Sequence, residues 1–410
     1  MMDGKAGDRL SFPSLTAFHG GGVLALDAEL AGTGSPADLL TLSGVVSGRT
    51  LVRVNNTSKL PGVRGADNIF IIDQGSVPTG NEFALENGPI PVGFLYYDLR
   101  PDDDGSTFWE LYQSGPNQKK IDELPVLMTG LQNLWHAGVS AWHQRMGDLV
   151  TLAAMPELQP AADFPGAPPL PRMQGGLWLR GYGEQARYDT TVSVDFRQDI
   201  EGFQGGLDGV IPGPLGGDSV IAGLLGGFVR SDLDFKGAPD NASYEGNTLG
   251  AYLTYLNGGF HADLLFKTDL VTVTFDQGPL TTDFDATAIG GSFELGYKFD
   301  LGSGLFANPL GQLAYVSSRI DDGWVGSAPV AFDDGDSLRG RAGLRMGLLE
   351  TVGSLAVEPY VEAYLMHEFT GDDRAWVYDY PAAPSGLGSW GMAGGGVQVM
   401  AANLTATIYY

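Results

Sequence analysis

The chain has no cysteine, so neither a disulfide nor a thiolate metal site is available to it. It contains no run of about 18 apolar residues, which argues against a membrane-spanning α-helix. Basic residues are scarce, and 23 lysines and arginines against 49 acidic residues give a net charge of −26. Because nucleic acid is bound by basic surfaces, this balance argues against it as a partner. With 410 residues, the chain is long enough for two or three domains.

The second half of the sequence alternates apolar residues with polar or very small ones. In residues 260–270, for example, Phe260 and Leu264 fall on one strand face, and Asp263 and Lys267 fall on the other. Repeated segments of this kind, separated by turn residues, are typical of an antiparallel transmembrane β-barrel. We predict eleven strands, over residues 177–187, 196–211, 218–235, 245–257, 259–275, 285–301, 304–320, 336–350, 355–369, 388–401 and 403–410.

The polar face of these strands carries many charges. Arg339, Arg341 and Arg345 share one face of a single predicted strand, an arrangement that suits a wet lumen and not an apolar core. We expect residues of this face to form hydrogen bonds with a helix and so keep the pore plugged. The predicted wall residues are Arg180, Glu294, Lys298, Arg339, Arg341 and Arg345, and the predicted helix partners are Gln132, Gln144 and Arg145.

Aromatic residues close to strand ends are expected to form the girdles that mark the two membrane interfaces. Trp178, Tyr255 and Trp390 occupy such places.

Residues 121–153 change to a helical period, with apolar residues at spacings of three and four. Asp122 can cap the start of this predicted helix, and Pro125 falls in its first turn. The following segment, 154–173, is rich in proline and is predicted to be a stiff linker. The barrel is expected over residues 174–410.

Residues 1–120 contain short apolar segments spaced about ten residues apart, with Gly, Asn and Asp between them. This pattern suits either a β-sandwich or the coils of a parallel β-helix. Two aromatic segments, 94–99 and 108–112, predict a hairpin that covers the open end of a solenoid.

The sequence supports no catalytic, cofactor or metal site. His19-Gly20-Gly21-Gly22 copies an oxyanion-hole motif, but no G-x-S-x-G nucleophile motif accompanies it. Asp102, Asp103 and Asp104 could attract calcium, yet the spacing of an EF-hand is missing. We therefore interpret these segments as turns and solvated loops, and we expect no enzyme.

Several segments resemble a known family when they are taken in order. They are Gly175 to Gly183 (GGLWLRGYG), Leu134 to Leu149, Gly343 to Gly347 (GLRMG) and Glu358 to Ala363 (EPYVEA). Their order over most of the chain resembles the monomeric (type V), pertactin-like autotransporters of Gram-negative bacteria. Residues 80–112 resemble the end of the passenger, the exported part of such proteins, where a β-helical segment assists folding.

The resemblance implies an all-β fold with a twelve-stranded barrel in the outer membrane and the linker helix in or near its pore. It implies that residues 1–120 end a right-handed β-helical, adhesin-like passenger at the cell surface. The implied partners are outer-membrane lipid, the barrel-assembly machinery and periplasmic chaperones, around a monomer. Whether the passenger is cleaved stays open.

The chain departs from the family at both ends. Residues 1–10 are charged and lack the apolar core of a signal peptide, and Tyr410 ends only the eleventh predicted strand. Because a barrel in lipid is expected to close with an even number of strands, either the last strand is missing or one was not counted. We therefore expect a fragment. The alternative is a soluble β-solenoid or β-sandwich binding protein, whose apolar strand faces would point inward.

Overall fold

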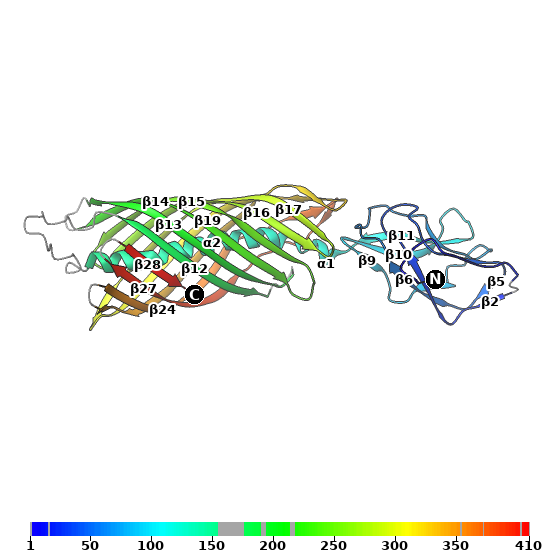
Figure 1. The fold of residues 1–410 in the computed structure, drawn as a ribbon, viewed down its shortest axis with the longest axis horizontal. Helices are drawn as coiled ribbons and strands as arrows, with labels where there is room; N and C mark the ends of the chain where they lie inside the picture. The colour runs from blue at the N-terminus through cyan, green and yellow to red at the C-terminus, as the bar shows by residue number, and fades with distance from the viewer. Residues whose placement is uncertain are drawn as a thin grey trace, which may run out of the picture.

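The computed structural model describes residues 2–14, 17–154, 176–189, 194–213, 218–352, 355–371, 373–401 and 404–409, with the backbone only at residues 143–154, 212, 351–352, 355, 400–401 and 404–409. A small β-rich unit lies at one end of a long barrel, and one helix runs along the inside of that barrel (Figure 1). The predicted linker 154–173 falls almost entirely outside the described residues.

The N-terminal unit is built from stacked parallel strands. Its strands pair in parallel, as in the coils of a β-helix. This holds for β1-β4-β7, for the two-stranded sheet β2-β5 and for the three-stranded sheet β3-β6-β8. The antiparallel hairpin β10-β11 pairs onto β7, and its Trp109 packs edge-on against Phe83 at 5.4 Å between ring centroids. The strands are β1 (Arg9–Phe12), β2 (Ala17–His19), β3 (Val23–Ala28), β4 (Leu39–Leu42), β5 (Val45–Ser47), β6 (Thr50–Asn56), β7 (Ile69–Asp73), β8 (Phe83–Leu85), β9 (Ile90–Val92), β10 (Leu95–Pro101) and β11 (Phe108–Pro116).

Two helices follow, α1 (Gln118–Ile121) and α2 (Leu124–Ala154). The period of the sequence predicted α2, but it placed the start of one continuous helix near Asp122. Asp122 is instead the C-cap of α1, and its carboxylate accepts hydrogen bonds from Gln118 and from the backbone of Ala383, both at 2.7 Å. The described helices include none that is both long enough and apolar enough to pass through a bilayer.

The barrel wall is a meander in which each strand pairs antiparallel with the next. Eleven strands form the ring among the described residues: β12 (Leu177–Tyr188), β13 (Phe196–Pro212), β14 (Ser219–Phe235), β15 (Asn241–Asn257), β16 (Phe260–Gln277), β17 (Leu280–Tyr297), β19 (Leu305–Ile320), β22 (Gly335–Leu348), β24 (Leu355–Thr370), β27 (Ser389–Ala401) and β28 (Leu404–Tyr409). The predicted strands match these to within two residues with two exceptions. The strand 245–257 starts four residues late, and 285–301 starts five residues late and includes the separate β18 (Phe299–Gly302).

The ring closes between its first and last strands. β12 pairs with β28 in parallel over six residue pairs, from Leu177 with Leu404 to Tyr182 with Tyr409. In a meander with an odd number of strands, the first and last strands run in the same direction. When these two strands pair to close the ring, they therefore pair in parallel. The eleven strands predicted from the sequence are the eleven of the described ring, and the twelfth strand that the resemblance implies has no counterpart among the described residues.

The remaining short strands lie at the ends of the barrel. A four-stranded sheet, β20 (Gly323–Val325), β21 (Ala328–Phe332), β25 (Ala375–Val377) and β26 (Tyr380–Pro381), extends two loops at the end that faces the N-terminal unit. β23 (Glu350–Val352) pairs with β24 at the opposite end. Because barrels in outer membranes carry longer loops outside the cell, the end with this sheet is the extracellular one.

The two faces of the wall have opposite chemistry in the membrane-spanning part. Leu264, Phe266 and Leu270 point outward and are 37–59% exposed, whereas Asp263 and Lys267 on the same strand point inward and are almost fully buried. An outward apolar belt of this kind faces lipid and contradicts the soluble alternative.

One predicted set of outward residues was partly wrong. Trp178 and Trp390 were expected in an interfacial girdle, but both face the lumen. The ring of Trp178 lies 6.4 Å from that of Tyr252, and the ring of Trp390 lies 6.1 Å from that of Tyr188 and 5.3 Å from the guanidinium carbon of Arg339.

The alternation reverses towards the extracellular end. On β16, Val271, Val273 and Phe275 point inward and are buried, while Thr272 and Thr274 point outward. This part of the wall therefore has the apolar interior and polar exterior of a soluble barrel, which places it beyond the lipid. The interior of the barrel is apolar at the extracellular end and charged farther down.

Candidate functional site

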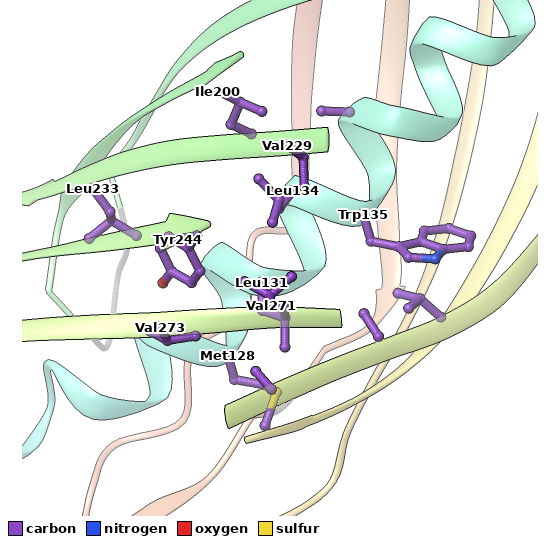
Figure 2. Packing of buried hydrophobic residues seen from close by; sticks show 14 of the residues in the cluster. Met128, Leu131, Leu134, Trp135, Ile200, Val229, Leu233, Tyr244, Val271 and Val273 are labelled. Atoms are coloured by element: carbon purple, nitrogen blue, oxygen red, sulfur yellow. The ribbon is translucent and has the colours of Figure 1, made fainter. Parts of the chain in front are cut away.

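Helix α2 occupies the lumen, and its first half packs into the apolar part of the barrel (Figure 2). Met128, Leu131 and Leu134 are fully buried, and the side chains of β13 to β16 that surround them are apolar too. Tyr244 adds a polar anchor, because its hydroxyl donates to the carbonyl of Leu127 at 3.0 Å. Close apolar packing of this kind on the side of β13 to β16 restricts the passage of water past the helix.

Polar contacts between helix and wall begin within the same half of α2 and continue beyond it. Asn133 donates to Gln198 at 2.9 Å and accepts from Arg339 at 2.7 Å. Gln198 and Gln204 donate to the carbonyls of Gly130 and Gly138 at 3.0 and 3.1 Å. The wall thus binds the helix backbone directly at two glycines.

Ion pairs line the charged part of the wall. Arg341 lies 2.9 Å from Glu294, and Lys267 lies 2.7 Å from Asp269. All four side chains are almost fully buried by protein. Such charges are tolerated in a protein interior only when they are paired, so these ion pairs are a fixed part of the structure.

The predicted wall residues lie in the lumen, but they differ in what they contact. Arg180 donates to the carbonyl of Ala141, and Arg341 donates to Ser140 at 3.1 Å, so both reach the helix, as does Arg339 through Asn133. Arg345 pairs with Glu362 at 3.0 Å, and Lys298 pairs with Glu358 at 2.9 Å, in both cases within the wall.

The predicted helix partners are placed less uniformly. Gln132 donates at 2.8 Å to Asp373, which belongs to a loop and not to a barrel strand. The side chains of Gln144 and Arg145 lie outside the described part of the chain, although their backbone belongs to α2.

Sequence reasoning missed an aromatic cluster between the helix and the wall. The ring of Trp142 lies 3.9 Å from that of Tyr252 and 5.5 Å from that of Trp178, and its indole nitrogen donates to Asp263 at 2.6 Å. The available signal was Trp178, which belongs to the lumen-facing set of its strand together with Arg180. Because Trp178 is two residues from Arg180, both side chains point to the same side of the strand, so Trp178 cannot face the membrane interface.

The extracellular loop 371–388 binds the start of α2. Buried Asp373 accepts hydrogen bonds from Thr129 at 2.9 Å and from Gln132 at 2.8 Å, and Ser385 contacts Thr129. Burial raises the pKa of Asp373 to about 7. In the turn between the helices, burial likewise raises the pKa of Glu123, to about 8, although Lys120 lies 3.1 Å away.

We expect these two carboxyl groups to make the barrel less stable at pH 8 than at pH 5. Between the ordinary pKa of Asp, near 4, and about pH 7 the folded chain keeps a proton on Asp373 that the unfolded chain has released. Folding then takes up a proton, so stability falls as the pH rises through this window. For Asp373 alone the loss over this whole window is at most about 4 kcal/mol, because its pKa is raised by about 3 units and each unit is worth about 1.4 kcal/mol. Glu123 adds a loss in the same direction.

A folded barrel that is not boiled runs on a denaturing gel as a compact band, faster than the boiled chain. The measurement is the temperature at which this compact band is lost, compared at pH 5 and pH 8. Asp373→Asn is expected to reduce the difference, and Asp373→Asn with Glu123→Gln to remove most of it. A difference that is the same size in the double variant would contradict the assignment.

Within the described residues, no group of three or more His, Asp or Glu side chains is arranged to hold a metal ion. The arrangement described above is one of packing, hydrogen bonds and paired charges. What it can do physically is hold a helix in a pore and restrict passage through that pore.

Comparison with known proteins identifies the barrel. The family profile described as "Autotransporter beta-domain" matches residues 177–410, more than half of the chain. The crystal structure of the beta domain of the Bordetella autotransporter Brka aligns with a TM-score of 0.44 at 21% identity, over 55% of this chain and 86% of that one. The transport unit of AIDA-I from Escherichia coli aligns with a TM-score of 0.44 at 16% identity, over 62% and 86% of the two chains.

Curated relatives extend the likeness beyond the barrel. Pertactin autotransporter of Bordetella bronchiseptica is 28% identical over 58% of this chain and 24% of its own length. BrkA autotransporter of Bordetella pertussis is 25% identical over 88% of this chain and 34% of its own length. Autotransporter adhesin/invasin TibA of Escherichia coli O78:H11 is 28% identical over 51% and 21%. The chain spans between about a fifth and a third of the length of these relatives. By the match over residues 177–410, the chain belongs to the autotransporter β-domain family, the outer-membrane barrels of autotransporter proteins.

Proposed function

We propose that this chain is a translocator that anchors and exports its own passenger, with an adhesin-like passenger at the cell surface. The observation that carries the proposal is one continuous chain that crosses a lipid-facing barrel. It leaves the β-helical unit at α1, enters the lumen as α2, and then forms the wall itself. A segment inside its own barrel joins the exterior to the membrane anchor.

The parts of the chain have separate roles in this proposal. Residues 1–120 are the passenger end, 121–153 the linker helix, 154–173 the linker and 174–410 the barrel. Relatives that carry the word adhesin in their names support an adhesin-like passenger.

Autotransporter translocators are generally not enzymes, and we propose that this chain performs no catalysis. As partners we propose outer-membrane lipid, the barrel-assembly machinery and periplasmic chaperones. The reason is that the apolar belt must be kept from aggregating until it meets lipid. We propose that the barrel works as a monomer.

The role of the lumen residues is part of the same proposal. Arg180, Arg339 and Arg341 bind the helix from three points of the wall, at Ala141, Asn133 and Ser140. We propose that they hold the helix as a plug after export, and that Glu294 keeps Arg341 in place.

The test is to express the whole chain behind a cleavable secretion leader in a Gram-negative host, with a short epitope in the N-terminal unit. Protease added to intact cells is expected to remove the epitope, while the barrel keeps a faster unboiled gel band. The control for a misfolded barrel is a variant with Lys267→Glu, which replaces the buried cation that pairs with Asp269 by a second carboxylate and is expected to impair folding of the barrel.

Two outcomes would contradict the proposal. Protection of the epitope in intact cells, with a folded barrel present, would mean that the passenger end is not exported. A chain that stays soluble without detergent would argue against the anchor itself.

A further inference from the structure

A groove on the outside of the barrel, away from the helix, has no role in the function proposed above. Its volume is about 860 Å³, within the range typical of small-molecule sites. It lies over β17, β19, β22, β24 and β27, and its walls include Phe293, Leu313 and Leu365, which are 46–77% exposed. The groove is therefore continuous with the lipid-facing belt.

The depth of the groove comes from small residues at outward positions. One row of paired residues across the five strands runs Phe293, Leu313, Gly340, His367, Ser389. The next row runs Leu295, Gly311, Ala342, Leu365, Gly391. Larger side chains stand on both sides of the small ones, so the wall has an elongated hollow along these two rows.

A polar pair lies in the groove close to the extracellular border of the belt. His367 Nδ1 is 2.7 Å from the hydroxyl of Ser389, and the ring of Phe369 stands edge-on to His367 at 4.7 Å. Tyr315 marks this border, one row nearer the exterior than Leu313. The hydroxyl of Tyr315 donates to exposed Asp336 at 2.8 Å.

The chemistry of this pair indicates what it would bind. When Nδ1 accepts the serine proton, Nε2 carries the other proton and can donate it. Among the described residues Nε2 has no protein acceptor. A donor at this depth lies where the acyl chains of the outer leaflet join their headgroups through ester or amide carbonyls.

We propose that the groove holds one acyl chain of an outer-leaflet lipid, with His367 donating to the carbonyl at the head of that chain. Lipid, and not a protein, is the occupant because the groove belongs to the membrane belt. This inference rests on the membrane placement of the barrel and does not depend on export of a passenger.

The test uses the whole chain refolded into phosphatidylcholine vesicles in which a fraction of the lipid carries a diazirine on one acyl chain. After irradiation, labelled peptides are mapped by mass spectrometry. Labelling at Phe293, Leu313 and Leu365 is expected to exceed that at Leu224, Phe228 and Leu249, on the other side of the belt, by several-fold. Even labelling around the belt would overturn the proposal.

A filled groove supplies the matched comparison. Gly311→Leu with Ala342→Leu is expected to reduce labelling of the groove to the belt average. A Cβ at Gly311 comes no closer than 4.0 Å to its nearest neighbour, so this change adds bulk without a clash. Gly226→Leu is the control, because Gly226 is also outward-facing and its nearest contact would be an ordinary 3.6 Å to Leu249.

The polar end has its own test. With a probe whose diazirine sits next to the carbonyl, His367→Leu is expected to remove the excess labelling of Phe369. Unchanged labelling in both the filled-groove and His367 variants would contradict the proposal. Each variant is first checked for the heat-sensitive compact band, so that only folded barrels are compared.

Discussion

Replacing Arg339 and Arg341 together with alanine is expected to raise the ion conductance of the reconstituted barrel several-fold and to lower its thermal stability. Both guanidinium groups bridge helix and wall. Arg339 joins Asn133 to Glu368, and Arg341 joins Ser140 to Glu294. Without them α2 loses two of the hydrogen bonds, at Asn133 and Ser140, that hold it against β22.

The loss of stability has a separate cause. Each replacement leaves a buried carboxylate without its cation, and breaking a buried ion pair in this way costs about 3–5 kcal/mol. The sum of the two losses is an upper bound for the double variant. Ser337 still donates to Glu368 after Arg339 is removed, and the two sites lie on one strand, so their effects need not add. The measurements are single-channel conductance in a planar bilayer and the temperature at which the compact band is lost.

Two controls separate the effects. Arg319→Ala removes an exposed arginine, 3.3 Å from Asp321, and is expected to change neither quantity. Arg341→Met with Glu294→Met removes a whole ion pair, so most of the stability should return while the contact with Ser140 stays lost. Conductance equal to that of the unmodified barrel in the Arg339 and Arg341 double variant would refute the plugging role.

Gly130→Ala is expected to destabilise the barrel, although alanine favours an isolated helix by about 1 kcal/mol over glycine. A Cβ at this position would lie 2.8 Å from Cζ of Tyr244 and 2.9 Å from Cδ1 of Leu233. Tyr244 is fully buried and holds the carbonyl of Leu127, so the helix has to move away from the wall. Overpacking of this kind costs about 1–3 kcal/mol, which exceeds the gain in propensity.

The helix and the wall must be adjusted together to reverse this effect. Gly130→Ala with Tyr244→Leu removes the ring that causes the clash and is expected to recover part of the lost thermal stability. The measurement is again the temperature at which the compact band disappears. A single variant that is more stable than the unmodified barrel would mean that the helix does not pack on Tyr244.

The sequence predicted the strands and their lipid-facing side because the period of two is imposed by the backbone itself. On β16, Phe260, Leu264 and Phe266 fall on one face whatever the strand packs against. The same parity placed Arg339, Arg341 and Arg345 in the lumen. The helical period of residues 124–149 likewise follows from local geometry and predicted α2.

The sequence did not reveal that the alternation reverses in the outer part of the barrel. Val271, Val273 and Phe275 lie on the same side of β16 as Asp263 and Lys267, so parity predicts that they point inward, but only the position of the membrane border decides that the outward residues beside them meet water and not lipid. That border is a property of the whole ring and of the bilayer, so no single strand carries it.

Which luminal groups meet was likewise decided by the tertiary structure. Asn133 and Arg339 are 206 residues apart, and Thr129 and Asp373 are 244 apart. By itself the sequence determined which side chains face the lumen and which face lipid, since that depends on strand parity alone. The tertiary structure alone decided the partners of each charge and the depth of the helix, because these depend on how the ring closes around α2.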